Sequence, residues 1–197
     1  FLSITCLLNA ADKPVIQIHT DNSSLIFRVA DNGRLYQSYL GKKLNHEADI
    51  SHLPQGTEAY ITHGMEDYFE PAIHILHNDG NPSLLLKYVS HETKAVSQGV
   101  NETIITLGDD KYPVTVKLHY VTYPAEDIIK TYTEISHKEK KPVVLHQYAS
   151  SMLHLNRAKY YLTEFSGDWA HEANISDQPL EFGKKVLDTK LGARATC

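Results

Sequence analysis

The fold class is decided by the stretch Tyr112-Pro-Val-Thr-Val-Lys-Leu-His-Tyr-Val-Thr-Tyr123, in which apolar and polar side chains alternate. Successive side chains of an extended chain point to opposite faces, so Val114, Val116 and Tyr120 share one face. Lys117 lies on the other face. This period of two is typical of a strand with one buried face. We therefore expect Tyr112–Tyr123 to form a core strand of an antiparallel sheet.

The same alternation recurs in short runs along the chain, each bounded by Gly, Pro, Asn or Asp. These runs are Val15–His19, Leu25–Ala30, Arg34–Leu40, Ala72–His77, Leu84–Ser90, Thr103–Leu107, Ile128–Ser136, Val143–Tyr148 and Tyr160–Phe165. No window shows a convincing helical period, and Lys42–Thr62 is the longest irregular stretch. The sequence therefore predicts an all-β fold, a large antiparallel β-sandwich (a supersandwich) with few or no helices.

Composition limits the function classes. The chain has 197 residues and a net charge of −5, with 19 basic and 24 acidic side chains. A length of this order suits one domain, and the charge argues against a nucleic-acid partner, because such proteins cluster Lys and Arg. The basic run Lys138–Lys141 is interrupted by Glu139, and we interpret it as a solvated turn before the strand at Val143.

Residues 1–11 form an apolar run followed by small residues, which resembles the end of a secretory signal peptide. We expect an exported protein, in the bacterial periplasm or outside the cell, whose domain covers residues 12–197. An ordinary first strand is the alternative, and a lipid anchor at Cys6 fits the preceding residues less well. The run is too short to span a bilayer, so no membrane span is expected.

Cysteine and histidine give little support to a metal or nucleophile site. The two cysteines, Cys6 and Cys197, exclude a disulfide framework. His74 and His77 are the closest histidine pair, but on a strand positions i and i+3 point to opposite faces. There is no Gly-x-Ser-x-Gly motif. We therefore predict no metal and no cofactor.

Carboxylates are the better candidates, because glycoside hydrolysis uses two of them. Two clusters combine acidic and aromatic side chains, Glu66-Asp67-Tyr-Phe-Glu70 and Asp168-Trp169-Ala-His-Glu172. Carboxylates accept hydrogen bonds from sugar hydroxyls, and aromatic rings cover the apolar face of a pyranose. The alternative for each is structural: Glu70-Pro71 opens a strand, and Trp169 anchors a core.

These clusters belong to a set of motifs that occur in one order. Thr62-His-Gly-Met-Glu-Asp-Tyr-Phe-Glu-Pro-Ala-Ile73 resembles the Gly-x-Gly-Asp-Phe-Arg-Glu-Pro-Ala segment of the amino-terminal domain of glycoside hydrolase family 36 α-galactosidases. Further matches to that domain follow along the chain. They are Leu85-Leu-Lys-Tyr-Val-Ser-His-Glu92, Val116-Lys-Leu-His-Tyr120, Asp127-Ile-Ile-Lys-Thr131 and Leu162-Thr-Glu-Phe-Ser-Gly-Asp-Trp-Ala-His-Glu172.

The resemblance implies a β-sandwich that precedes a (β/α)₈ barrel, with both catalytic aspartates of a retaining α-galactosidase on the barrel. It therefore implies no catalytic residue in this chain. The implied partners are that barrel, an α-galactoside oligosaccharide and further copies of the protein in a homo-oligomer. The family's loop can reach a sugar site, commonly that of a neighbouring subunit.

By position, Asp67 matches the Asp of the family's loop and Tyr68 its Phe. Glu66 stands where the family has its second Gly, and Phe69 where it has Arg, so α-N-acetylgalactosaminides stay open as substrates. We expect Glu66, Asp67 and Tyr68 to contact substrate. Structural or interface roles are expected for Gly167, Trp169 and Glu70. Two other readings stay open, a stand-alone carbohydrate-binding module and a structural or adhesin-type sandwich.

Overall fold

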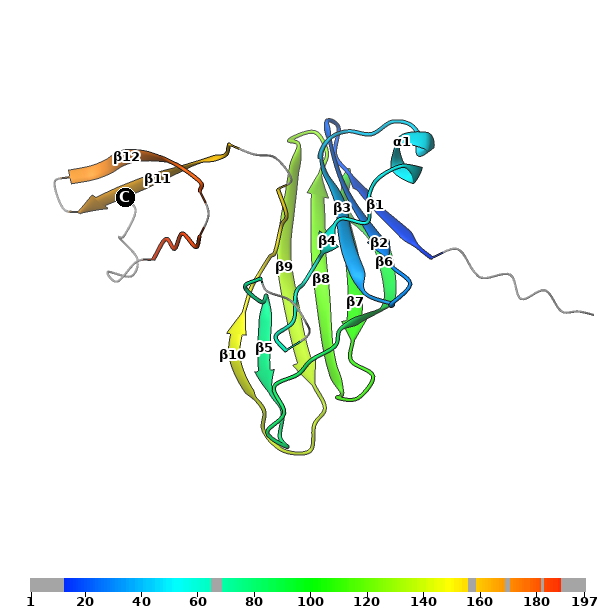
Figure 1. Cartoon of the computed structure of the whole chain (residues 1–197). Coiled ribbons are helices and arrows are strands. Elements are labelled where there is room, and N and C mark those ends of the chain that lie inside the picture. The colour runs from blue at the N-terminus through cyan, green and yellow to red at the C-terminus, as the bar shows by residue number, and fades with distance from the viewer. Residues whose placement is uncertain (1–12, 65–68, 156–158, 169–170, 182, 189–197) are drawn as a thin grey trace, which may run out of the picture. The chain divides into compact units, whose positions relative to one another are not determined.

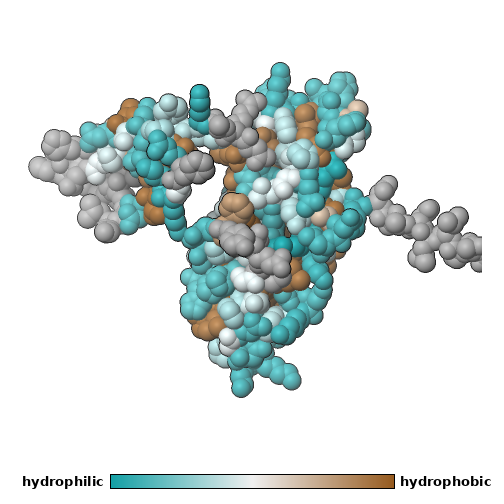
Figure 2. Space-filling view, in the orientation of Figure 1, coloured by the Kyte–Doolittle hydropathy of each residue, from teal (hydrophilic) through white to brown (hydrophobic). Residues whose placement is uncertain are grey.

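The computed structural model describes residues 13–64, 69–155, 159–168, 171–181 and 183–188 (Figure 1). On the face shown in Figure 2, hydrophilic residues predominate among the coloured ones, with hydrophobic residues scattered between them. The chain divides into two compact units, Phe1–His154 and Leu155–Cys197, and each is described by itself. None of the helices in the described ranges is long and apolar enough to cross a membrane.

The described residues of the first unit form two four-stranded antiparallel sheets and a two-stranded one. In the first sheet the order is β1 (Val15–His19), β2 (Ser23–Val29), β3 (Leu35–Lys42) and β4 (Thr57–Glu58). The second sheet runs β6 (Lys87–Ser97), β7 (Val100–Gly108), β8 (Val114–Tyr123) and β9 (Ile128–His137). β5 (Ile73–Leu76) pairs with β10 (Val144–Tyr148), and the short helix α1 (Glu47–Ser51) follows β3.

The core lies between the two four-stranded sheets and confirms the predicted all-β sandwich. Val116 of β8 is fully buried, and Leu118 is paired in register with Ile105 of β7, also fully buried. From the opposite sheet, the Phe27 ring lies 5.1 Å from that of Tyr120. The faces of β8 are therefore those that its alternating sequence predicts, because burial of one apolar face fixes the register of a strand.

Most predicted strands are present, with shifted ends. β1 has the predicted bounds, whereas β6 begins only at Lys87 and continues to Ser97. Leu84 and Leu86, placed in that strand by the sequence, are buried in the preceding segment. Their burial accounts for the apolar pattern that predicts a strand at these positions. The predicted irregular stretch Lys42–Thr62 contains α1 and β4.

The described residues of the second unit form an antiparallel hairpin. Its strands are β11 (Tyr161–Asp168) and β12 (His171–Pro179). Phe165 pairs with Ile175 in register, and a register shift falls between Ser166 and Asp168. A two-stranded hairpin is only marginally stable in isolation.

Candidate functional site

The loop that the sequence singles out, His63–Phe69, is described at its two ends only. Glu66, Asp67 and Tyr68 lie outside the described residues, so their predicted contacts with substrate stay predictions. We call residues 61–64 the N-terminal stem and residues 69–73 the C-terminal stem. The geometry of these stems determines where the loop leaves the sandwich.

Backbone hydrogen bonds hold the two stems together. The carbonyl of Ile61 accepts from the N–H of Ala72 at 2.7 Å and from that of Ile73 at 3.3 Å. In return, the N–H of His63 donates to the carbonyl of Ile73 at 3.0 Å. Ile61, Ala72 and Ile73 are all buried. The base of the loop is therefore fixed in the core.

Gly64 ends the N-terminal stem in a position that favours glycine. Its φ is +85°, a left-handed conformation that residues with a Cβ rarely adopt. A Cβ added to Gly64 would lie 3.1 Å from the Oγ of Ser83 and 3.2 Å from its Cα. The stem therefore packs closely against the segment that precedes β6.

Gln147 of β10 holds the C-terminal stem from the side. Its amide Nε2 donates to the carbonyl of Pro71 at 2.7 Å and to Oε1 of Glu70 at 3.3 Å. Apart from this contact with Gln147, Glu70 is exposed to solvent, and the preceding residue, Phe69, is 68% exposed. Glu70 thus belongs to the stem, and β5 opens three residues later, at Ile73.

Three imidazole rings lie next to one another at the stems, the first pair stacked and the second tilted, and we call His63, His74 and His146 the histidine stack. The ring centroids of His63 and His74 are 3.8 Å apart with planes 25° from parallel. The centroids of His74 and His146 are 4.8 Å apart, at 34°. The three rings come from the N-terminal stem, β5 and β10.

A β-bulge places His146 in this stack. Leu145 pairs with Ile75 and Gln147 with His74, so His146 is the extra residue between them. Bulges re-aim side chains and are over-represented near functional sites. The same bulge thus brings the His146 ring to His74 and the Gln147 amide to the C-terminal stem.

The histidine stack favours an uncharged His74. Burial lowers the pKa of His74, and positive charge on His63 and on His146 lowers it further. Sequence reasoning considered His74 only as a partner for His77, and no pattern in the sequence pointed to His63 or His146. They meet only through the pairing of β5 with β10.

His77 has different surroundings. It is buried, its Nδ1 lies 2.7 Å from Oε1 of Glu139, and its ring stacks on that of Tyr112 at 3.5 Å. The rings of His74 and His77 therefore have different neighbours. Within the described ranges, no group of three His, Cys, Asp or Glu side chains is placed to hold a metal ion.

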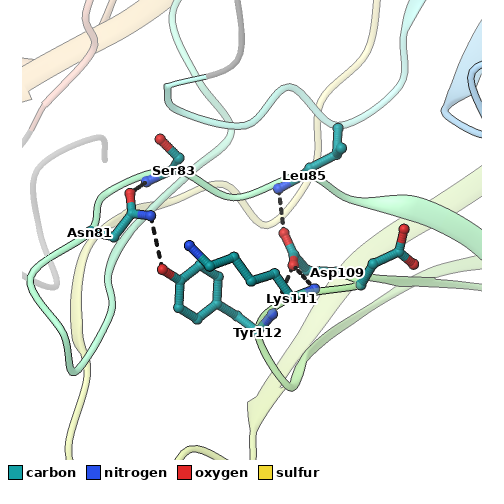
Figure 3. Close-up of a pocket in the computed structure, with 7 residues that line it drawn as sticks. Asn81, Ser83, Leu85, Asp109, Lys111 and Tyr112 are labelled. Carbon is teal, nitrogen blue, oxygen red and sulfur yellow. Dashed lines mark hydrogen bonds between the residues drawn. The ribbon is translucent and has the colours of Figure 1, made fainter.

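A hollow of about 260 Å³ lies between the segment before β6 and the turn from β7 to β8 (Figure 3). The carboxylate of Asp109 accepts from the N–H groups of Leu85, Lys111 and Tyr112 at 2.6, 2.7 and 2.8 Å. The Tyr112 hydroxyl accepts from the amide of Asn81 at 2.8 Å. These groups bond to one another, so we assign the hollow a structural role.

A second polar cluster ties the strands of the β6–β9 sheet together on its outer face. Glu102 Oε1 accepts from the Tyr132 hydroxyl at 2.6 Å and lies 2.9 Å from Nδ1 of His119, and its Oε2 lies 3.0 Å from Nζ of Lys94. Hydrogen bonds from Tyr132, His119 and Lys94, in this order, lower the pKa of Glu102 to about 2. The cluster contains one residue from each strand, which indicates a structural role.

The second acidic and aromatic cluster is described only in part. Gly167 lies in β11 at the register shift between Ser166 and Asp168, where a residue without a side chain is common. Trp169 lies outside the described residues. The structural or interface roles predicted for Gly167 and Trp169 stay predictions.

Comparison with known proteins identifies the family to which this sandwich belongs. Residues 33–196 match the glycosyl hydrolase family 36 N-terminal domain. The chain belongs to this family. Two fungal relatives of the domain are the probable α-galactosidase G of Aspergillus terreus, 24% identical over 142 residues, and α-galactosidase C of Emericella nidulans, 25% identical over 142 residues. Each alignment covers 66% of this chain.

Part of each of two solved α-galactosidase structures has the same fold as this N-terminal domain. The α-galactosidase AgaA of Geobacillus stearothermophilus superposes with a TM-score of 0.77 at 19% identity, over 86% of this chain and 28% of that one. The α-galactosidase of Lactobacillus brevis gives 0.73 at 21% identity, with the same coverage of both chains. The chain spans only about 20% of the length of the fungal relatives it matches.

Proposed function

We propose that the chain is the non-catalytic amino-terminal domain of a retaining α-galactosidase that hydrolyses terminal α-linked galactosides. The observation that carries this proposal is the family match over residues 33–196, together with relatives named as α-galactosidases. Structures of AgaA in complex with raffinose and with stachyose support an α-galactoside oligosaccharide as the substrate class. The catalytic aspartates would lie on a (β/α)₈ barrel of the full-length enzyme.

Within that enzyme we propose that the loop His63–Phe69 helps to shape the sugar pocket and a subunit interface of a homo-oligomer. Asp67 would accept hydrogen bonds from sugar hydroxyls, and Tyr68 would cover an apolar face of the ring. Support comes from the stems, because a base held by backbone bonds and by Gln147 lets a loop present side chains with little loss of entropy. We also propose that residues 1–11 are the end of a signal peptide that directs export of the protein.

Replacing Asp67 by alanine is expected to reduce kcat/KM of the full-length enzyme on nitrophenyl α-galactoside by roughly tenfold to a hundredfold. The reason is lost positioning of the sugar. The free energy of unfolding should change by less than about 0.5 kcal/mol, because the substitution leaves the hydrogen bonds that hold the two stems unchanged. Steady-state kinetics and urea denaturation measure the two effects.

Asp31→Ala is the matched control, since Asp31 is an exposed aspartate that pairs with Lys13 on the surface. It should leave the kinetics unchanged. The 197-residue chain alone should hydrolyse neither α-galactoside nor α-N-acetylgalactosaminide. Turnover by that chain, or wild-type kinetics in the Asp67 variant, would contradict the proposal.

A further inference from the structure

Strand β6 has a long free edge. The sheet order β6-β7-β8-β9 places β6 at one side of its sheet, and among the described residues of the first unit its ladder partner is β7 alone. Every residue of β6 after Tyr88 is exposed. Such an edge presents unpaired backbone N–H and C=O groups, which form a template for a further strand.

The other edge strands of the two four-stranded sheets offer less. β1 and β4 have 5 and 2 residues, whereas β6 has 11. Alternate residues of β9 are half-buried, and its Thr133 hydroxyl donates to the carbonyl of Ser150 at 3.0 Å. The sequence of β6 also contains no proline, a residue that commonly blocks pairing at a sheet edge.

Two bulges limit the part of this edge that can accept a strand. The register of β6 against β7 shifts between Tyr88 and Ser90, and again between Ala95 and Ser97. The start of β6 is closed as well, because the N–H of Tyr88 donates to the carbonyl of Gly33 at 2.8 Å. Since a bulge disrupts a ladder, regular pairing on the free edge is confined to Ser90–Ala95.

Two charged side chains on this segment determine which strand fits. Glu92 and Lys94 are two residues apart on β6, so their side chains share one face. On that face, Nζ of Lys94 lies 3.0 Å from Oε2 of Glu102. Among the described residues, the Glu92 carboxylate has no hydrogen-bond or ion-pair partner. An antiparallel copy of the same strand would supply one.

We propose that β6 pairs with β6 of a second copy of the chain, antiparallel and centred on Thr93, so that the two sheets become continuous. In an antiparallel pair, opposite residues either both exchange hydrogen bonds or both do not. A strand therefore pairs with its own symmetric copy only about a residue, never about a point between two residues.

The charges select Thr93 as the centre. In this register Glu92 of each copy lies opposite Lys94 of the other, and such opposite-charge pairs stabilise a sheet. Centring on Glu92 or on Lys94 would oppose like charges, which is destabilising. Centring on His91 or on Ala95 would bring a bulge within two residues of the centre.

This inference goes beyond the proposed function, because the surface lies outside the loop His63–Phe69. The pairing uses backbone groups and surface charges, so it holds whichever substrate the enzyme takes. Addition of a strand to a sheet edge is a recurring mode of association, in which main-chain hydrogen bonds supply affinity and side chains supply specificity.

The test is disulfide trapping in the full-length enzyme. Thr93 would face Thr93, and opposite Cα atoms of an antiparallel pair lie about 4.5 to 5.5 Å apart, a distance that a disulfide spans. Thr93→Cys should therefore give a covalent dimer under mild oxidation, visible on a non-reducing gel. Ser136→Cys, at an exposed position of β9, is the matched control and should stay at the wild-type level.

Charge exchange tests the register. In the Thr93→Cys background, Glu92→Lys opposes two bases and Lys94→Glu opposes two acids, and each should slow cross-linking by about fivefold or more. A mixture of the two variants sets the bases of one copy against the acids of the other. A mixed covalent dimer should therefore form at close to the rate of Thr93→Cys alone. Circular dichroism of each variant checks that it is folded.

Cross-linking of Thr93→Cys no faster than that of Ser136→Cys would overturn the inference. So would a rate that neither charge exchange alters, or a mixture that does not recover. These readouts are independent of turnover, so a failure here is distinguishable from a failure of the proposed function, which the kinetics of Asp67→Ala test.

Discussion

Replacing Gly56 by alanine is expected to destabilise the sandwich by roughly 3 to 5 kcal/mol, because two costs add at this position. The φ of Gly56 is +83°, where an L-residue is strained. In addition, a Cβ at Gly56 would lie 1.9 Å from the carbonyl oxygen of Gln37 and 2.7 Å from its carbonyl carbon. Both are backbone atoms of β3, so no side chain can move to relieve the overlap.

The surroundings of Gln37 make the relaxation costly. Gln37 is completely buried, its amide Nε2 donates to the carbonyl of His154 at 2.7 Å, and its Oε1 accepts from the N–H of His154 at 3.1 Å. It also pairs in register with Thr57 of β4. A shift of the Gln37 backbone would break these bonds and leave buried polar groups without partners.

Gly80→Ala is the matched control. The φ of Gly80 is +84°, almost equal to that of Gly56, but nothing lies within 4 Å of the position of its Cβ. Its cost should be only the backbone strain, about 1 to 2 kcal/mol. Urea denaturation of the two variants measures the difference, and equal midpoints would show that the close approach to Gln37 does not matter.

Strands with one buried face were predictable from the sequence. β8 shows why: Val116 and Leu118 enter the core, and Lys117 between them does not. β6 gives no such signal, since all its residues after Tyr88 are exposed and it is held by backbone pairing with β7. β12 is similar, because its sequence His171–Pro179 has no alternation and its ladder with β11 defines it.

The acidic and aromatic composition of Glu66–Glu70 and the family resemblance mark the loop, whereas no periodicity does, because a connecting loop has none. The structure adds its stems. Gly64 was visible as a glycine, but the close approach of Ser83 that requires one was not. The histidine stack was not predictable, since it depends on the β5–β10 register and on a bulge at His146. Contacts between segments distant in sequence are invisible to local patterns.

Glu139 shows the same limit in a basic run. The sequence predicts a solvated turn at Lys138–Lys141, and the three lysines are exposed as expected. The Glu139 side chain, however, is only 2% exposed and turns inward to His77. The composition of this segment predicts only the average exposure of its side chains. It does not predict the buried contact between Glu139 and His77.

Replacing Glu139 by alanine is therefore expected to destabilise the sandwich by about 3 to 5 kcal/mol, the usual cost of removing one partner of a buried pair. Oε1 of Glu139 lies 2.7 Å from Nδ1 of His77, and its Oε2 accepts from the N–H of Asn78 at 3.1 Å and from the Asn78 side-chain amide. Alanine would leave the buried His77 without this acceptor and would also remove the two bonds from the exposed Asn78.

Glu134→Ala is the matched control, because Glu134 is 52% exposed and its pair with Lys117, at 3.3 Å, lies on the surface. It should cost less than about 1 kcal/mol.

Burial raises the pKa of Glu139, but the hydrogen bonds from His77 and Asn78 outweigh this effect, so the pKa is lowered. The stabilisation by Glu139 is thus present above the ordinary glutamate pKa of 4.5 and is lost as pH falls below it. Urea denaturation at pH 7 and pH 3.5 tests both statements: the gap between Glu139→Ala and the wild type should narrow at the lower pH, and a gap no larger than that of Glu134→Ala at pH 7 would refute the buried pair.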